Sequence, residues 1–314
     1  DARMMQGHRW GVIAILFAAV VWGTTGTAAT FAPDVSAAAI GAAAMGLGGI
    51  AQALWAGRGI LNQRARLWQQ RRLLVIGAVA VAVYPLAFYG AMRLAGVTVG
   101  TVITIGSAPL ISALIEYVLD GRRLTLRWSL GAAVGLIGMG LICLAENAAH
   151  GETLRAPSVP LGVLLGLIGG FTYALYSWSA RKMMLQGTGS TVAMGATFGL
   201  GGLLLMPVLL VSGGAFLASW NNAAVGLYMA AVPMFLGYIA FGYGLARVEA
   251  SMATVITLFE PVVAAVLAVV IVGERLPPLG WIGVALVIGC LAIITLPLPS
   301  PLRRGVAAQP PGVA

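Results

Sequence analysis

The residues best suited to chemistry in this sequence lie beside two prolines inside long apolar segments. Glu260 precedes Pro261 and is the only acidic residue deep within such a segment. An ionised carboxylate at that depth in a membrane is costly, so it is normally paired, protonated or exposed to a water-filled cavity. Glu260 is therefore a candidate to carry a coupling proton or to bind a substrate ammonium group. The alternative is a hydrogen-bonded structural acid beside the proline.

A second acid, Glu116, lies within about one helical turn of the end of its apolar segment. Arginines follow it closely in the sequence, and long basic side chains at helix ends extend readily toward polar surroundings. We expect Glu116 to pair with Arg122 or Arg123.

Polar side chains recur at every third position before each proline, and the two sets are separated by 153 residues. The sets are Thr98, Thr101, Thr104 and Ser107, and Ser251, Thr254, Thr257 and Glu260. A spacing of three drifts by roughly 60° per step on an α-helix, so one cavity cannot receive them all. We expect the members nearest the prolines, Thr104, Ser107, Thr257 and Glu260, to line the site. The alternative is that the hydroxyls bond carbonyls one turn earlier and hold helices together.

Pro109 and Pro261 occupy matched positions in the two segments. A proline inside a helix lacks an N–H donor and clashes with the carbonyl four residues earlier, here Ile105 or Thr257. Each is a candidate hinge that exposes a carbonyl at the binding site, and a static kink needed for packing is the alternative.

Aromatic residues divide by depth. Six tryptophans fall at segment ends or in loops, as membrane-interface anchors do: Trp10, Trp55, Trp68, Trp128, Trp220 and Trp281. Aromatics within the segments include Tyr173, Tyr176, Trp178 and Tyr243. Trp22, Tyr84, Tyr238 and Phe259 lie nearest mid-segment, so we select them as candidates to contact a planar side chain or an ammonium group, with ordinary packing as the alternative.

The elements that position these residues are ten apolar segments, each about as long as a membrane-crossing helix requires. They cover roughly residues 10–31, 35–57, 72–94, 98–119, 126–146, 159–181, 189–212, 222–247, 250–272 and 278–297. The composition agrees, with 60% hydrophobic and 9% charged residues. The sequence predicts an all-α integral membrane protein with ten transmembrane helices.

The second half of the sequence repeats the first. The four residues Thr101–Thr104 recur as Thr254–Thr257, and a Gly-x-Arg-Leu sequence recurs at Gly121 and Gly273. We therefore divide the chain into a five-helix repeat, 1–150, and a second repeat with a C-terminal tail, 151–314. Five is odd, so the second repeat would cross the membrane inverted, which is an architecture typical of alternating-access transporters.

Basic residues predict the orientation, because they favour the cytoplasmic side of a membrane. With a cytoplasmic N-terminus, the inner connections hold Arg3, Arg9, Arg58, Arg64, Arg66, Arg71, Arg72, Arg122, Arg123, Arg127, Arg181, Lys182, Arg247, Arg303 and Arg304. The outer connections hold only Arg93, Arg155 and Arg275. Both termini are expected in the cytoplasm. The scatter of these residues argues against a nucleic-acid partner.

These features resemble the EamA-type drug/metabolite transporter superfamily over about residues 10–297. The resemblance rests on the five-plus-five repeat, on Trp22-Gly23 midway along the first helix, and on Pro261 followed by Gly273-Glu274-Arg275-Leu276. It is closest to bacterial exporters of aromatic and other neutral amino acids. The first repeat departs from the pattern, because Asp120-Gly121-Arg122-Arg123 replaces Gly-Glu-Arg.

The resemblance implies a bacterial inner-membrane transporter, not an enzyme, that exports small amino acid-like metabolites by alternating access. Its partners would be that substrate and the lipid bilayer, and the sequence is compatible with a monomer. Export of drugs or other metabolites is the alternative, and a channel or scaffold is a remoter one. We expect no cofactor and no metal site, because no histidine or aspartate lies deep within a span.

Overall fold

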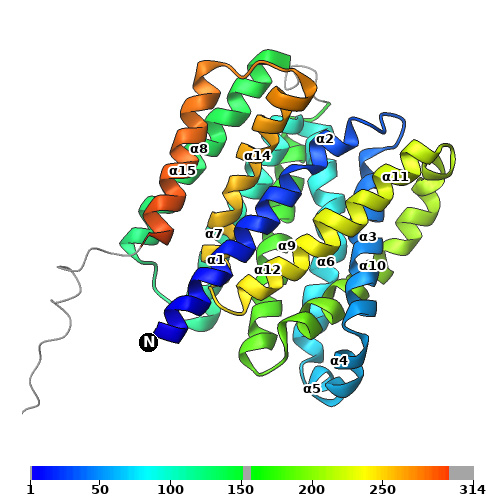
Figure 1. Cartoon of the computed structure of the whole chain (residues 1–314), viewed down its shortest axis with the longest axis vertical. Coiled ribbons are helices and arrows are strands. Elements are labelled where there is room, and N and C mark those ends of the chain that lie inside the picture. Colours follow the sequence, from blue (N-terminus) through cyan, green and yellow to red (C-terminus); the bar gives the residue numbers. More distant parts are fainter. Residues whose placement is uncertain (1, 151–156, 297–314) are drawn as a thin grey trace, which may run out of the picture.

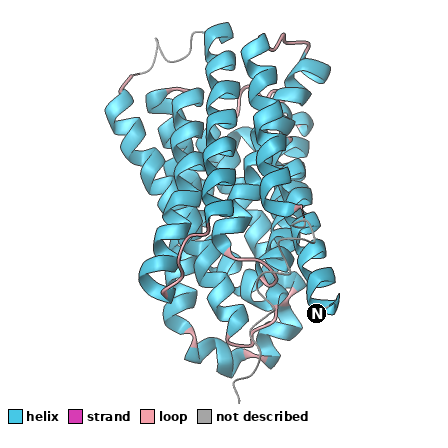
Figure 2. Cartoon of the chain, turned by 90° about the vertical axis from the view of Figure 1, so that its left-hand side faces the viewer, coloured by secondary structure: helices cyan, strands magenta, loops and turns pink. Residues whose placement is uncertain are grey.

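The computed structural model describes residues 2–150 and 157–296. Every regular element in these two ranges is helical (Figure 2). Within them, ten helical stretches are long and apolar enough to cross a membrane. The prediction of an all-α protein with ten membrane-spanning helices is confirmed.

The first five spans are α1 (Ala2–Gly23) with α2 (Thr25–Ala29), α3 (Ala37–Trp55), α6 (Arg71–Ala95), α7 (Val97–Asp120) and α8 (Leu126–His150). The sixth span is α9 (Val159–Leu185), and the seventh is α10 (Ser190–Ser212) followed by η2 (Gly213–Leu217). The eighth span consists of α11 (Trp220–Met229), η3 (Ala230–Leu236) and α12 (Gly237–Leu245). The ninth consists of α13 (Ala250–Ile256), η4 (Thr257–Phe259), α14 (Glu260–Leu267) and η5 (Ala268–Val272), and the tenth is α15 (Pro278–Thr295). Two short helices, α4 (Gly57–Asn62) and α5 (Arg64–Gln69), connect α3 to α6.

Two helix pairs form the edges of the bundle, as Figure 1 shows. α3 packs along α10 at one edge and α8 packs along α15 at the other. The helices between them include α1, α6, α7, α9, α12 and the α13–α14 span, with extensive contacts of α9 against α6 and α7 and of α1 against α12. The largest cluster of buried apolar side chains lies among these central helices.

Small residues let the edge helices approach closely. A methyl group built on Gly49 of α3 would lie 2.2 Å from the Phe198 carbonyl oxygen of α10. At the other edge, a methyl group on Gly283 of α15 would lie 2.5 Å from the Gly138 carbonyl oxygen of α8. Glycine at these two contacts is typical of helices that associate in lipid through van der Waals packing.

Three central helices are interrupted within their spans. The first span breaks at Thr24, between α1 and α2. The eighth contains the π-helical segment η3, which includes Pro233, and the ninth contains the 3₁₀ turn η4 directly before Glu260. Irregular backbone at membrane depth is tolerated where protein or a water-filled cavity surrounds it. The interruptions therefore point to the centre of the bundle as the place for a site.

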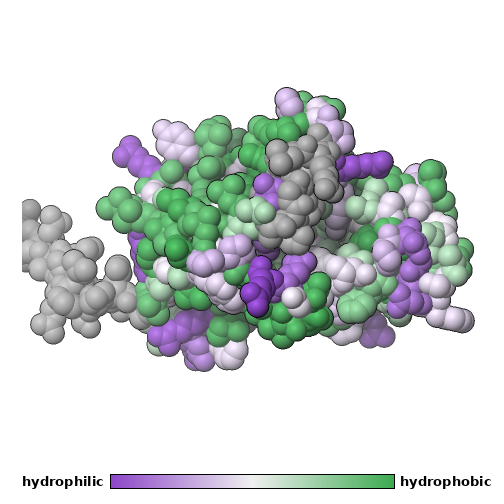
Figure 3. Space-filling view, turned by 90° about the horizontal axis from the view of Figure 1, so that it is seen from above, coloured by the Kyte–Doolittle hydropathy of each residue, from purple (hydrophilic) through white to green (hydrophobic). Residues whose placement is uncertain are grey.

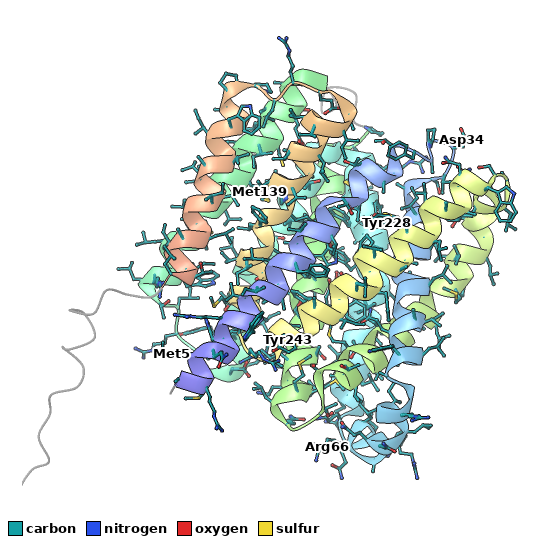
Figure 4. All side chains as sticks on the ribbon, in the orientation of Figure 1. Met5, Asp34, Arg66, Met139, Tyr228 and Tyr243 are labelled. Atoms are coloured by element: carbon teal, nitrogen blue, oxygen red, sulfur yellow. The ribbon has the colours of Figure 1, made fainter. Side chains whose placement is uncertain are left out.

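The two ends of the bundle differ in charge. We call the end that carries α4, α5 and the α7–α8, α9–α10 and α12–α13 connections the basic end; Arg66 lies there, whereas Asp34 lies at the opposite end (Figure 4). Seen from the opposite end, apolar side chains cover much of the outer contour (Figure 3). Such an exposed apolar surface is expected of a protein surrounded by lipid.

Candidate functional site

A cavity lies where the interrupted helices meet. Its walls come from α1, α2, α3, α6, α7, α9, η3, α12 and α14. The lining residues are Trp22, Thr25, Gly41, Ala44, Met45, Tyr84, Pro85, Phe88, Tyr89, Ile105, Tyr173, Tyr176, Met234, Tyr238 and Glu260. We call this space the aromatic cavity. Its volume is about 40 Å³, which is room for about three water molecules and too little for a drug-sized ligand.

Seven of the fifteen lining residues are aromatic, and their rings pack against one another. The Trp22 and Tyr238 ring centroids are 4.7 Å apart, and those of Tyr84 and Tyr173 are 5.7 Å apart. The Trp22 indole N–H donates to the Pro233 carbonyl oxygen at 2.8 Å, within the π-helical segment. The interruption η3 thus supplies the acceptor that fixes the indole, because a buried tryptophan N–H needs a partner.

Glu260 brings the carboxyl group of the cavity. It follows η4 and begins α14, where Pro261 occupies the first turn and fits the fixed backbone angle of that position. Among the described residues, the Glu260 carboxyl makes no hydrogen bond or ion pair, and no lysine or arginine lines the cavity. The carboxyl therefore faces aromatic rings without a compensating cation.

Two hydroxyl pairs close the side of the cavity that faces the basic end. The Tyr173 hydroxyl lies 2.8 Å from Thr257 Oγ1, and the Tyr176 hydroxyl lies 2.8 Å from the Tyr238 hydroxyl. All four residues are buried. We call them the tyrosine layer. It joins α9 to η4 and α12.

The predicted site residues divide between the cavity and the surrounding packing. Trp22, Tyr84, Tyr238 and Glu260 line the cavity together. Thr257 does not line it but bonds Tyr173 directly behind the wall.

The remaining candidates lie elsewhere. Thr104 packs against Gly166 and Gly169 of α9, and Ser107 donates to the Thr104 carbonyl oxygen at 3.3 Å. Phe259 packs in the cluster around Ile142, toward α8 and α15.

The prolines also take different positions. Pro109 lies inside the continuous helix α7, whereas Pro261 lies in the first turn of α14 after a break. The hydroxyls of Thr254 and Thr257 bond carbonyls three or four residues earlier, as the alternative interpretation of the polar stripe predicts.

Several wall residues were not selected from the sequence. Tyr173 and Tyr176 were noted only as in-span aromatics, although their spacing of three places them on one face of a helix. Phe88 and Tyr89 were not selected either, although Tyr89-Gly90-x-x-Arg93 matches Tyr243-Gly244-x-x-Arg247 in the other repeat. Their role follows from the way α6 packs against α9, which brings Tyr84 within 5.8 Å of Tyr176, centroid to centroid.

A second cavity, of about 370 Å³, lies at the basic end. Its walls come from the ends of α7 and α9 and from the α12–α13 connection. Its lining residues are Glu116, Leu119, Asp120, Arg122, Trp178, Arg181, Lys182, Leu185 and Glu249. We call it the charged vestibule. It holds three acidic and three basic side chains, in contrast to the aromatic cavity.

The predicted pairing of Glu116 with Arg122 or Arg123 is wrong. The Glu116 carboxylate instead accepts from the Ser251 backbone N–H at 3.0 Å and from the Ser251 hydroxyl at 2.6 Å. Arg122 pairs with Glu249 at 2.8 Å. The physical reason is that Gly121 ends α7 in a left-handed conformation and carries Arg122 away from its own helix. Glu116 then meets the positive N-terminus of α13.

A family model matches this chain twice, at residues 9–144 and 160–296, and its description is EamA-like transporter family. The chain belongs to this family. The assignment indicates a transporter of the superfamily, not an enzyme, and it agrees with the resemblance found in the sequence.

Curated relatives extend over most of the chain. The uncharacterized transporter YwfM of Bacillus subtilis is 32% identical over 93% of this chain and 96% of its own length. A probable terminal-alkyne amino-acid exporter of Streptantibioticus cattleyicolor is 28% identical over 87% and 92%. The threonine/homoserine exporter RhtA of Escherichia coli is 25% identical over 65% and 68%. A crystal structure of a protein with 20% identity superposes with a TM-score of 0.73 over 95% of this chain and 99% of its own, which supports the fold.

Proposed function

We propose that this EamA-like transporter exports small amino acid-like metabolites by alternating access, with aromatic and neutral amino acids as the best candidates. The observation that carries the proposal is the unpaired Glu260 carboxyl in a cavity of aromatic rings. A primary ammonium group would satisfy that carboxyl and lie against Trp22, Tyr84 and Tyr238 by cation–π attraction. Two relatives named as amino-acid exporters support the substrate class.

A proton and an ammonium group would compete for the same carboxyl. If each binds only when the other has left, export of the substrate is coupled to entry of a proton. A carboxylate inside a membrane is costly without a partner, so the empty, ionised carrier would be the least favourable to reorient. Glu260 is thus placed to act as both substrate counter-ion and coupling group.

Alternating access is supported by the closed state of the cavity. A volume of about 40 Å³ holds only a few waters, so a bound amino acid requires the walls to separate. The tyrosine layer closes the basic-end side through buried hydrogen bonds. Thr25, Tyr84, Phe88 and Tyr89, which lie toward the opposite end, are partly exposed. We assign this conformation as closed to the basic end.

The inverted repeat supports the same mechanism. The family model matches each half separately. The edge pairs α3–α10 and α8–α15 join the second span to the seventh and the fifth to the tenth. When the two halves are exchanged, the first span takes the place of the sixth, the second that of the seventh, and so on. Each edge pair then corresponds to itself, and the α6–α9 contact corresponds to the α12–α1 contact. Two such halves can exchange conformations around a central site.

We propose that the protein is a multi-pass carrier of a bacterial inner membrane, compatible with a monomer, with the basic end and both termini in the cytoplasm. The excess of arginine at that end supports the orientation. Export of drugs or other metabolites is the second candidate, because the aromatic wall accepts many apolar shapes. A channel or scaffold role is remoter, since the tyrosine layer closes the path.

Purified protein in liposomes tests the proposal. Radiolabelled phenylalanine, tryptophan and threonine are offered with and without a proton gradient, next to a matched preparation of Glu260→Gln. We expect saturable, gradient-dependent uptake by the wild type and loss of gradient dependence in the variant. Equal, saturable uptake by both would assign Glu260 to structure. If none of the amino acids is taken up, export of drugs or other metabolites becomes the favoured function.

A further inference from the structure

The charged vestibule contains one basic side chain that makes no direct ion pair with a described carboxylate, although Glu249 and Glu116 lie near enough to act on its charge. Asp120 accepts from Lys182 Nζ at 2.8 Å through one oxygen and from Trp178 Nε1 at 2.8 Å through the other. Arg122 is paired with Glu249. Arg181 makes no ion pair with a described carboxylate, and its guanidinium donates through Nη1 to the Leu245 carbonyl oxygen.

A half-buried guanidinium with spare donors is an unusual feature. Arginine is rarely buried unless it is paired, because desolvating its charge is unfavourable. Its planar group carries five N–H donors in a geometry that matches a carboxylate. In the vestibule these donors border a space of about 370 Å³, a size typical of small-molecule sites. The arrangement provides for an added carboxylate.

Acidic groups line the same space. Glu116 and Glu249 both border the vestibule, and each carboxylate oxygen has two acceptor positions. Trp178 supplies an aromatic surface whose N–H is already directed toward Asp120. A ligand with a carboxylate and an ammonium group a few ångströms apart would therefore find a partner for each charge.

We propose that the charged vestibule is a second binding site, which takes the α-amino acid zwitterion before it reaches the aromatic cavity. Arg181 binds the carboxylate of the ligand, and Glu116 and Glu249 face its ammonium group. This inference rests on the proposed function for the direction of travel, since the vestibule receives cytoplasmic substrate only if the basic end faces the cytoplasm. The chemistry of the site is independent of that orientation.

The two sites are close and share one helix. Tyr176 of the tyrosine layer and Arg181 of the vestibule are five residues apart on α9, which is about 7.5 Å along the axis. Both bond α12, Tyr176 through Tyr238 and Arg181 through the Leu245 carbonyl oxygen. A carboxylate that competes for the Arg181 guanidinium would loosen one of the contacts between α9 and α12. Binding in the vestibule thus favours opening of the path to the cavity.

Equilibrium binding to detergent-solubilised protein tests the site separately from transport. The probes are radiolabelled phenylalanine, which carries both charges, and phenethylamine, which lacks the carboxylate. The background is Glu260→Gln, in which the aromatic cavity has lost its charge. We expect phenylalanine to bind in this background. Arg181→Gln should weaken that binding at least ~10-fold, as loss of a charged hydrogen bond predicts, and change phenethylamine binding by less than ~3-fold.

Two further variants guard against a folding artefact. Arg181→Lys keeps the charge but loses the bidentate geometry, and it should restore part of the phenylalanine affinity. Arg71→Gln is the matched control, because Arg71 also lies at the basic end and donates to a helix carbonyl, that of Trp68, but does not line the vestibule. Phenylalanine binding should be the same with and without this substitution.

The outcomes separate this inference from the proposed function. Saturable transport by the wild type, with no phenylalanine binding in the Glu260→Gln background, would overturn the vestibule site and leave the proposed function intact. Binding that depends on Arg181, in a protein that transports no amino acid, would support the site and overturn the function. If Arg181→Gln instead reduces binding of phosphatidylglycerol and leaves phenylalanine unchanged, the guanidinium holds a lipid headgroup and the proposal is wrong.

Discussion

The aromatic cavity and the charged vestibule lie in the same bundle but differ in volume and in the charge of their walls. The cavity has a volume of about 40 Å³, a ring of aromatic side chains and one carboxyl without a cation. The vestibule has about 370 Å³ and a balanced set of three acids and three bases. The first is a narrow site that a ligand must widen, and the second is an open site that already offers both charges.

The difference indicates how selectivity is divided along the path. Charge pairs at an exposed surface contribute little affinity, because water screens them, but they admit only ligands of suitable charge. Burial in the cavity removes water, so an ammonium group there depends on Glu260 alone and the side chain depends on the aromatic wall. In this scheme the vestibule selects zwitterions and the cavity selects shape.

The largest effect should come from Glu260→Gln, which tests whether charge in the cavity is essential. The substitution keeps the shape and removes the only carboxyl in the cavity wall. Loss of a charged partner costs up to about 3 kcal/mol, so gradient-driven transport should fall by about 100-fold. Initial rates in proteoliposomes at saturating substrate measure this. Transport that keeps its full dependence on the proton gradient would remove Glu260 from the coupling role.

A smaller effect is expected when the boundary between the two sites is weakened. Tyr238→Phe leaves the buried Tyr176 hydroxyl without its partner, at a cost of about 1–3 kcal/mol to the conformation closed at the basic end. That end should open about 5- to 100-fold more often. Maleimide labelling of a cysteine placed at the fully buried Ala180, with Cys143 and Cys290 replaced by serine, measures the opening.

The double variant Tyr176→Phe/Tyr238→Phe provides the control for this experiment. Removing both hydroxyls leaves no unsatisfied group, so the cost is smaller than in either single variant. Labelling at Ala180 should therefore fall back toward the wild-type rate. A double variant that labels faster than both single variants would show that the rings, and not the hydrogen bond, keep the basic end closed.

Glu116→Gln should have a more modest effect, because it alters one cap at the edge of the vestibule. The Glu116 carboxylate stabilises the N-terminus of α13 through Ser251. The amide keeps one acceptor but loses the negative charge, at a cost of about 1 kcal/mol, or about 5-fold in the closed population. The same labelling assay detects it. An unchanged labelling rate would mean that α13 stays in place without the charge.

The sequence predicted the cavity better than the vestibule, for physical reasons. Ten spans follow from apolar length alone, and the unusual positions of Glu260 and Trp22 within spans single them out. The hydroxyl stripe did not predict the wall, because Thr104 and Ser107 turn toward the glycines of α9. The sequence did not predict the vestibule, because its walls come from α7, α9 and the α12–α13 connection, which are far apart in the chain. The left-handed turn at Gly121 determines that Arg122 pairs with Glu249, and this pairing cannot be predicted from spacing.

The smallest effect concerns the ion pair at the rim of the vestibule. Arg122 is half-exposed, so its bond to Glu249 contributes about 0.5 kcal/mol, and Arg122→Gln should change the KM for phenylalanine by less than ~3-fold. Burial raises the pKa of Glu249, but a hydrogen bond to its own backbone and the nearby Arg122 outweigh it and hold the pKa below the usual value of 4.5.

A carboxyl whose pKa is lowered by folding contributes stability above its unfolded pKa and loses it only as the pH falls through the folded value. Glu249 therefore stays ionised throughout the range from about pH 5 to pH 8. Any change of wild-type transport rate within that range must arise elsewhere, and Glu260 is the acid within the described spans that faces the substrate path unpaired. Rate–pH profiles of Arg122→Gln and wild type should be parallel. If the rate–pH profile shifts in Arg122→Gln and keeps its wild-type shape in Glu260→Gln, the titrating group lies in the vestibule. The pH dependence of transport would then arise in the vestibule and not in the aromatic cavity.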